Sequence, residues 1–100
     1  MIDNRKNFQD AKRLFQAILT LENEEECAKF FADLCTIKEM ADMAQRLQAA
    51  EMLLQGKTYE QIVKSVKIST ATISRINQCI QYGDGGYRTV IERLDQQKSE

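Results

Sequence analysis

The fold of this protein is decided by the stretch from Thr58 to Tyr82, which reads TYEQIVKSVKISTATISRINQCIQY. Apolar residues recur at helical spacing on both sides of a break at residues 67–69. The pattern predicts a short helix near 59–66 and a second helix near 70–82. Ile68 lies in the break, where it can fill the space between crossing helices. The residues expected to be buried are Tyr59, Ile62, Val63 and Val66 in the first helix, and Ile73, Ile76 and Ile80 in the second.

Two helices joined by such a break are typical of a helix-turn-helix, which we place at about residues 58–82. Two residues are unusual for that motif. Lys67 occupies a turn position that often needs positive φ, where glycine is more comfortable. Val63 is larger than the small residue usually found where the two helices touch. Any small helical bundle also contains helical hairpins, so the pattern alone favours DNA binding without deciding it.

The polar face of the second helix is the predicted functional surface. When its isoleucines face inward, the opposite face is short and polar and carries one cation, Arg75. Such side chains suit base edges in a major groove, and a helix N-terminus suits a phosphate. We expect lysines and Arg75 to hold phosphates, and the small polar residues to lie near bases. The predicted DNA-binding residues are Lys57, Gln61, Lys64, Ser69, Thr70, Ala71, Thr72, Ser74, Arg75 and Gln78.

The charge distribution singles out the same stretch. The 100 residues carry 14 basic and 15 acidic side chains, for a formal net charge of −1. Residues 1–55 are net −3 and residues 83–100 are net −1, whereas residues 56–82 are net +3. Glu60 is the only acidic residue in that basic segment. A basic segment in an acidic protein is compatible with a polyanionic partner, although four cations can also cluster by chance.

The rest of the chain also predicts helices, near 5–21, 24–35, 37–55 and 87–96. Asn23 and Thr58 each precede a glutamate or glutamine by three residues, which is the signature of a helix N-terminus. Gly56 predicts the end of the third helix, and residues 83–86 predict a loop. Because no stretch alternates like a strand, we expect an all-α fold forming a single domain over residues 1–100.

The apolar side chains of the first two helices point to a core shared between two chains. A core built from 100 residues is modest, and the N-terminal helices are rich in phenylalanine and leucine. We therefore expect a homodimer, with Phe8, Phe15, Phe30 and Phe31 in its shared core. The second helix is expected to bury Cys27, Phe30, Phe31 and Leu34. One face of the first helix carries Phe8, Ala11, Phe15, Ile18 and Leu19, and one face of the third carries Ile37, Met40, Ala41, Ala44, Leu47 and Leu54.

Several functional classes are disfavoured by composition. Histidine is absent, which removes the commonest general base and metal ligand. Cys27, Cys35 and Cys79 form neither a disulfide framework nor a metal motif, and we expect them to be small buried side chains. The sequence has no glycine-rich phosphate-binding loop that follows a strand, so we expect neither an enzyme nor a cofactor. No apolar window approaches the roughly 18 residues of a membrane helix, and the N-terminus lacks an apolar signal, so we expect a cytoplasmic protein without a membrane partner.

These residues resemble a known family. From Thr36 to Arg75, and more loosely over about 90 residues, the chain is similar to the Trp repressor superfamily. The match is carried by Leu53-Leu54-Gln55-Gly56-Lys57-Thr58 and by Thr70-Ala71-Thr72-Ile73-Ser74-Arg75. The ending Tyr82-Gly83-Asp84-Gly85-Gly86-Tyr87 resembles the narrower Trp-repressor-related YerC/YecD family. The resemblance implies an intertwined, all-helical homodimer that binds double-stranded DNA.

The resemblance also implies a ligand pocket, but an altered one. Thr36, Arg46 and Arg75 stand at the threonine and arginine positions of the tryptophan site in Trp repressors. Ile76 stands at the glycine position and would project where the indole lies, and Cys79 stands at the serine position, with a weaker hydrogen-bonding group. The turn is also one residue shorter than in members that bind tryptophan. We therefore expect a regulator that does not respond to tryptophan.

Two alternatives to a plain DNA-binding regulator stay open from the sequence. One is a helical protein-interaction module with an exposed apolar patch around Ile68 and Tyr82. The other is a regulator gated by a different small-molecule effector, bound in a reshaped pocket. The first predicts that partner binding is lost with Ile68→Asp and insensitive to Arg75→Ala.

Overall fold

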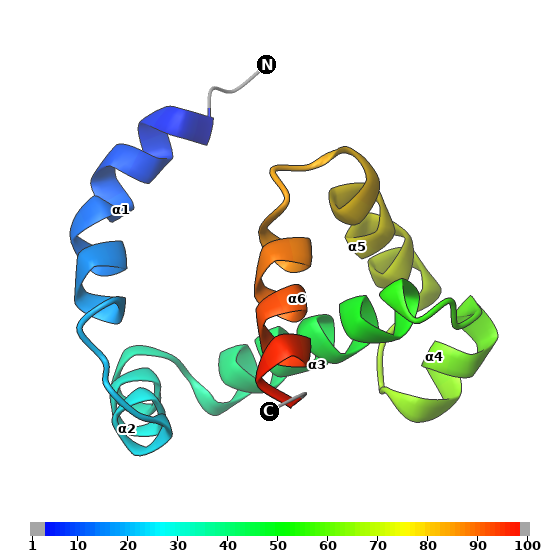
Figure 1. The fold of residues 1–100 in the computed structure, drawn as a ribbon, viewed down its shortest axis with the longest axis horizontal. Helices are drawn as coiled ribbons and strands as arrows, with labels where there is room; N and C mark the ends of the chain where they lie inside the picture. Colours follow the sequence, from blue (N-terminus) through cyan, green and yellow to red (C-terminus); the bar gives the residue numbers. More distant parts are fainter. Residues whose placement is uncertain (1–3, 99–100) are drawn as a thin grey trace. The chain divides into compact units, whose positions relative to one another are not determined.

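The computed structural model describes residues 4–98, with side chains for residues 8–97, and within that range it contains six helices and no strand (Figure 1). The predicted all-α class is confirmed, and each predicted helix end lies within three residues of the observed one. The helices are α1 (Asn4–Ile18), α2 (Glu24–Leu34), α3 (Ile37–Leu54), α4 (Tyr59–Ser65), α5 (Thr70–Tyr82) and α6 (Gly86–Lys98). None of these described helices is long and apolar enough to cross a membrane.

The chain divides into two compact units, one up to Ile37 and one from Lys38 onward. In the first unit the aromatic rings pack in pairs: the centroids of Phe8 and Phe15 lie 6.3 Å apart, and those of Phe30 and Phe31 lie 5.6 Å apart. No side chain among residues 8–37 is buried. One chain therefore does not bury the apolar faces of α1 and α2, and the core that they are predicted to share with a second chain stays a prediction.

The second unit contains the hydrophobic core. All four of its helices contribute, and α3 contributes two fully buried alanines from its C-terminal half. The buried residues are Ala49, Ala50, Ile62, Val66, Ile73, Ile76, Ile80 and Ile91. On the predicted apolar face of α3, Leu47 and Leu54 pack against this core, whereas Ala41, Ala44 and Ile37 are exposed in the single chain.

Side chains cap several of these helices as the sequence predicts. Asn23 Oδ1 accepts a hydrogen bond from the Glu26 backbone N–H at 2.8 Å. Thr58 and Gln61 form a full capping box at the start of α4. Gly56 ends α3 with φ +84°, and the Lys57 N–H donates to the Met52 carbonyl across it, as in a Schellman motif. These contacts fix the start of α2, the end of α3 and the start of α4.

The connection from α5 to α6 is held by one close approach and one hydrogen bond. A Cβ atom at Gly83 would clash with the Cys79 carbonyl, so the chain leaves α5 closer to the helix than a larger residue allows. Arg88 Nε, on α6, donates to the Ile80 carbonyl at 3.3 Å. Both features anchor the C-terminal end of α5 to the rest of the second unit.

Candidate nucleic-acid interface

Helices α4 and α5 form the predicted helix-turn-helix and pack against each other. Ile62 and Ile73 are fully buried between them, and Ile68 is half-buried against the same core. Tyr59 and Val63 were predicted to share this seam, but 36% and 42% of their surfaces are exposed. The reason is the length of α4, whose seven residues make about two turns and offer one buried row, Ile62 and Val66.

The turn between the helices is extended. Val66 has φ −125° and Ser69 has φ −77°, and no non-glycine residue among those described has positive φ. The expectation that Lys67 occupies a left-handed position is therefore wrong. Because the turn uses extended backbone, it needs no glycine.

The outer face of α5 is open. Thr70, Ala71, Ser74, Arg75 and Gln78 are exposed, while the isoleucine row on the opposite face is buried. The face that was predicted to contact base edges is thus free of the core in this chain. Arg75 forms no ion pair with the described residues, so its guanidinium is available to a ligand.

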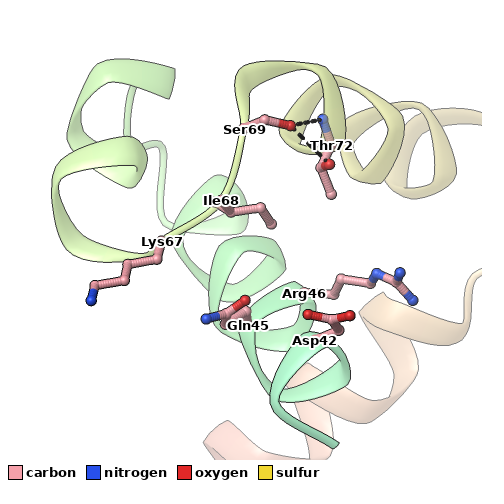
Figure 2. Close-up of a pocket in the computed structure, with 7 residues that line it drawn as sticks. All are labelled: Asp42, Gln45, Arg46, Lys67, Ile68, Ser69 and Thr72. Carbon is pink, nitrogen blue, oxygen red and sulfur yellow. Dashed lines mark hydrogen bonds between the residues drawn. The ribbon is translucent and has the colours of Figure 1, made fainter. Parts of the chain in front are cut away.

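Ser69 and Thr72 start the same helix. Ser69 Oγ accepts the Thr72 backbone N–H at 3.2 Å and lies 3.0 Å from Thr72 Oγ1 (Figure 2). This pairing leaves Thr72 half-buried, unlike the other residues predicted to face DNA. The two hydroxyls therefore hold the helix N-terminus in shape, which was not part of the predicted role.

The residues predicted to flank the groove lie on or before α4. Lys57 is exposed and forms no ion pair with the part of the chain that the structure describes. Gln61 Oε1 accepts the Thr58 N–H at 2.9 Å, which leaves the amide NH₂ group of Gln61 as its free donor. Lys64 Nζ lies 3.4 Å from Glu60 Oε1. Of these three residues, Lys57 is the least engaged within the chain.

A polar hollow of about 220 Å³ lies between α3 and the turn (Figure 2). Arg46 and Asp42 enter it from α3, and Ser69 and Thr72 from the start of α5. Asp42 and Gln45 were missed in the sequence, although Asp42 is one helical turn before Arg46 and so shares its face. The residues that line it are Asp42, Gln45, Arg46, Lys67, Ile68, Ser69 and Thr72.

A second, apolar hollow of about 520 Å³ lies beside the α5–α6 loop and includes Leu47, Cys79, Tyr87 and Val90. Cys79 is exposed there, and Cys27 and Cys35 are half-buried, so the prediction of three buried cysteines was wrong. Burial raises the pKa of Tyr87 above 10.0; the Cys79 thiol raises it further, and the Arg46 guanidinium lowers it. Tyr87 is therefore within electrostatic reach of both.

Comparison with known proteins identifies the family. The profile of the Trp repressor protein family matches residues 9–95. The chain belongs to the Trp repressor family. The uncharacterized protein YerC of Bacillus subtilis (strain 168) is 44% identical over 92 residues, which cover 92% of this chain and 88% of YerC. This relative confirms the narrower resemblance drawn from residues 82–87.

Two solved structures of the family share the fold. A TrpR-like protein from Eubacterium eligens is 44% identical, with a TM-score of 0.86 over 93% of this chain and 96% of that one. A Staphylococcus aureus protein provisionally described as a Trp repressor is 44% identical, with a TM-score of 0.88 over 95% and 96% of the two chains. Trp repressors bind DNA through a helix-turn-helix, the element that α4 and α5 form in this member.

The residues at the family's tryptophan-site positions have different surroundings in this Trp repressor family member. Arg46 lines the polar hollow and Cys79 lines the apolar one. Ile76 is 3% exposed and belongs to the core, and Arg75 is exposed on α5. Thr36 lies in the first unit, before the division at Lys38. A ligand site formed by these five residues stays a prediction.

Proposed function

We propose that this protein is a sequence-specific, DNA-binding transcriptional regulator whose reading helix is α5. The observation that carries the proposal is the division of α5 into a buried isoleucine row and an open polar face with Arg75. Base edges in the major groove present donors and acceptors that side chains of this kind can match. The basic segment 56–82 supplies the charge for backbone contacts.

The same proposal includes a homodimer and a single domain. Phe8, Phe15 and Leu34 are about half exposed in one chain, and a second copy would cover surfaces of this kind. One family profile spans both units, which supports treating residues 1–100 as one domain. In a dimer, the two reading helices would lie roughly 34 Å apart, one turn of B-DNA. A cytoplasmic location, as predicted from the sequence, is also part of the proposal.

Selection of bound duplexes from a random pool tests the proposal, with and without cell metabolites. We expect a palindromic consensus, and affinity for it should fall steeply as salt rises. Arg75→Ala should weaken binding and, if Arg75 holds a phosphate, reduce the salt slope by about 1. Arg93→Ala on α6 is the matched control and should bind as the parent does.

Binding that ignores salt and shows no preference over random DNA would contradict the proposal. The protein-interaction alternative has weaker support, because Tyr82 is 88% exposed but Ile68 is half-buried in the core. The effector alternative is favoured by the polar hollow at the turn, where a bound metabolite would contact α3 and α5 together. It predicts that the selected consensus is bound more tightly when metabolites are present.

A further inference from the structure

Glu60 is the one acidic side chain of the basic segment 56–82, and it lies on the helix that carries Lys64. Glu60 Oε1 lies 3.4 Å from Lys64 Nζ, and the two side chains are 80% and 74% exposed. Their spacing of four residues places both on one face of α4. The only cation on α4 is therefore engaged by a carboxylate in the free protein.

We propose that Glu60 is an electrostatic brake on DNA binding, which lowers affinity by neutralising Lys64. This inference rests on the proposed function, because it assigns a role to Glu60 in the same interface. A phosphate that binds Lys64 must replace or share the Glu60 carboxylate. A lysine already neutralised by the protein also releases fewer condensed counterions from DNA, so its contribution to the salt dependence falls.

Two effects set the strength of the brake: repulsion between Glu60 and a bound phosphate, and the weakness of an exposed ion pair. A phosphate bound at Lys64 would lie well within a Debye length of Glu60, about 10 Å at 0.1 M salt, so the two anions repel each other. The ion pair itself is exposed, and exposed pairs are weak and easily broken. Glu60 therefore reduces affinity for every duplex without preventing binding, since backbone contacts carry no sequence information.

Binding of a random-sequence duplex of roughly 21 base pairs, two helical turns, tests the brake across a salt series. We expect Glu60→Gln to raise affinity by up to about fivefold at low salt, the upper range for one exposed pair. The salt slope should steepen by about 0.9, so a fourfold rise in salt should cost the variant about 3.5-fold more affinity than the parent. Thermal melting checks that the variant is fully folded, because Glu60 also lies in the first turn of α4.

Glu25→Gln is the matched control. Glu25 pairs with Lys29 at the same four-residue spacing, at 3.3 Å, in the first turn of α2, and the two side chains are 79% and 75% exposed. Glu25→Gln makes the same change in net charge outside the helix-turn-helix, and we expect no change in affinity or slope. In a Lys64→Ala background, Glu60→Gln should raise affinity much less than in the parent, because the ion pair is gone and only the repulsion between Glu60 and the DNA remains.

Three results would overturn the brake while leaving DNA binding intact. Glu60→Gln could match the parent although Lys64→Ala weakens binding; Glu25→Gln could raise affinity as much as Glu60→Gln; or the gain could be undiminished in the Lys64→Ala background. A parent protein whose duplex binding ignores salt, Lys64→Ala and Arg75→Ala contradicts DNA binding itself, and the brake with it.

Discussion

Tyr87 connects the titration of a single residue to the stability of the second unit. It packs against the core, and burial, together with the Cys79 thiol, raises its pKa above the ordinary 10.0. Ionised Tyr87 is thus disfavoured in the folded chain relative to the unfolded one. Its contribution to stability is complete below pH 10.0 and is lost as pH rises through the higher folded pKa.

We expect Tyr87→Phe to remove that loss. The free energy of unfolding of the parent should fall more steeply above pH 10.0 than that of the variant, as measured by urea unfolding across an alkaline pH series. Tyr82→Phe is the control, because the Tyr82 side chain is 88% exposed. If the free energy of unfolding falls equally with pH in the parent and in Tyr87→Phe, the raised pKa of Tyr87 is not the cause of the alkaline loss of stability.

Single residues also show what periodicity does not encode. The isoleucine row of α5 follows helical spacing and is buried as predicted. Tyr59 and Val63 follow the same spacing on α4, yet they are exposed, because burial depends on how much of a helix its neighbours cover. Ser69 and Thr72 are residue types that often contact DNA, which is why the sequence predicts them there. Their mutual hydrogen bond depends on the three-dimensional geometry, which the sequence pattern does not show.

At the scale of elements, Gly56 sets the end of α3 and the start of the helix-turn-helix. Its φ of +84° lies in the left-handed region, and a Cβ there would meet no atom within 4 Å. Gly56→Ala should therefore cost only backbone strain, about 1–2 kcal/mol. For a protein of this size, we expect the melting temperature to fall by about 4–16 °C.

Gly86→Ala is the matched control for that substitution. Gly86 also has open space around its Cβ position, but its φ is not positive. Alanine there begins α6 and should not destabilise the protein. Equal losses at both positions would show that the left-handed conformation of Gly56 is not the cause.

The elements themselves were the most predictable part of the molecule. Caps at Asn23 and Thr58 and the stop at Gly56 are local chemistry, and the structure confirms each of them. The end of α1 was less predictable: the helix stops at Ile18, where the Thr20 hydroxyl donates to the Ala17 carbonyl at 2.6 Å. Apolar residues continue to Leu21, so a prediction from periodicity alone made this helix three residues too long.

At the scale of the whole molecule, burial within one chain and burial predicted from the sequence differ systematically. The predicted core of the second unit is largely present, whereas no side chain of residues 8–37 is buried. Hydrophobic periodicity reports which face avoids water but not which chain covers it. The exposed apolar residues of α1, α2 and the start of α3 are the surface that the predicted second copy would cover.

A homodimer should therefore reveal itself through concentration. We expect sedimentation equilibrium to give twice the chain mass of 11.5 kDa, and the melting temperature to rise with protein concentration, because association stabilises the folded chain. Phe15→Asp should shift the equilibrium toward monomer, since it places a charge on a surface that a second copy would bury.

Val63→Asp is the matched control for the dimer. Phe15 and Val63 are 45% and 42% exposed in one chain, so a monomeric protein should tolerate both substitutions about equally. A homodimer formed through α1 and α2 would cover Phe15 but not Val63, which lies on the helix-turn-helix, so only Phe15→Asp should shift the equilibrium toward monomer. A parent with the single-chain mass and a concentration-independent melting temperature would instead mean that the apolar faces of α1 and α2 meet water or another partner.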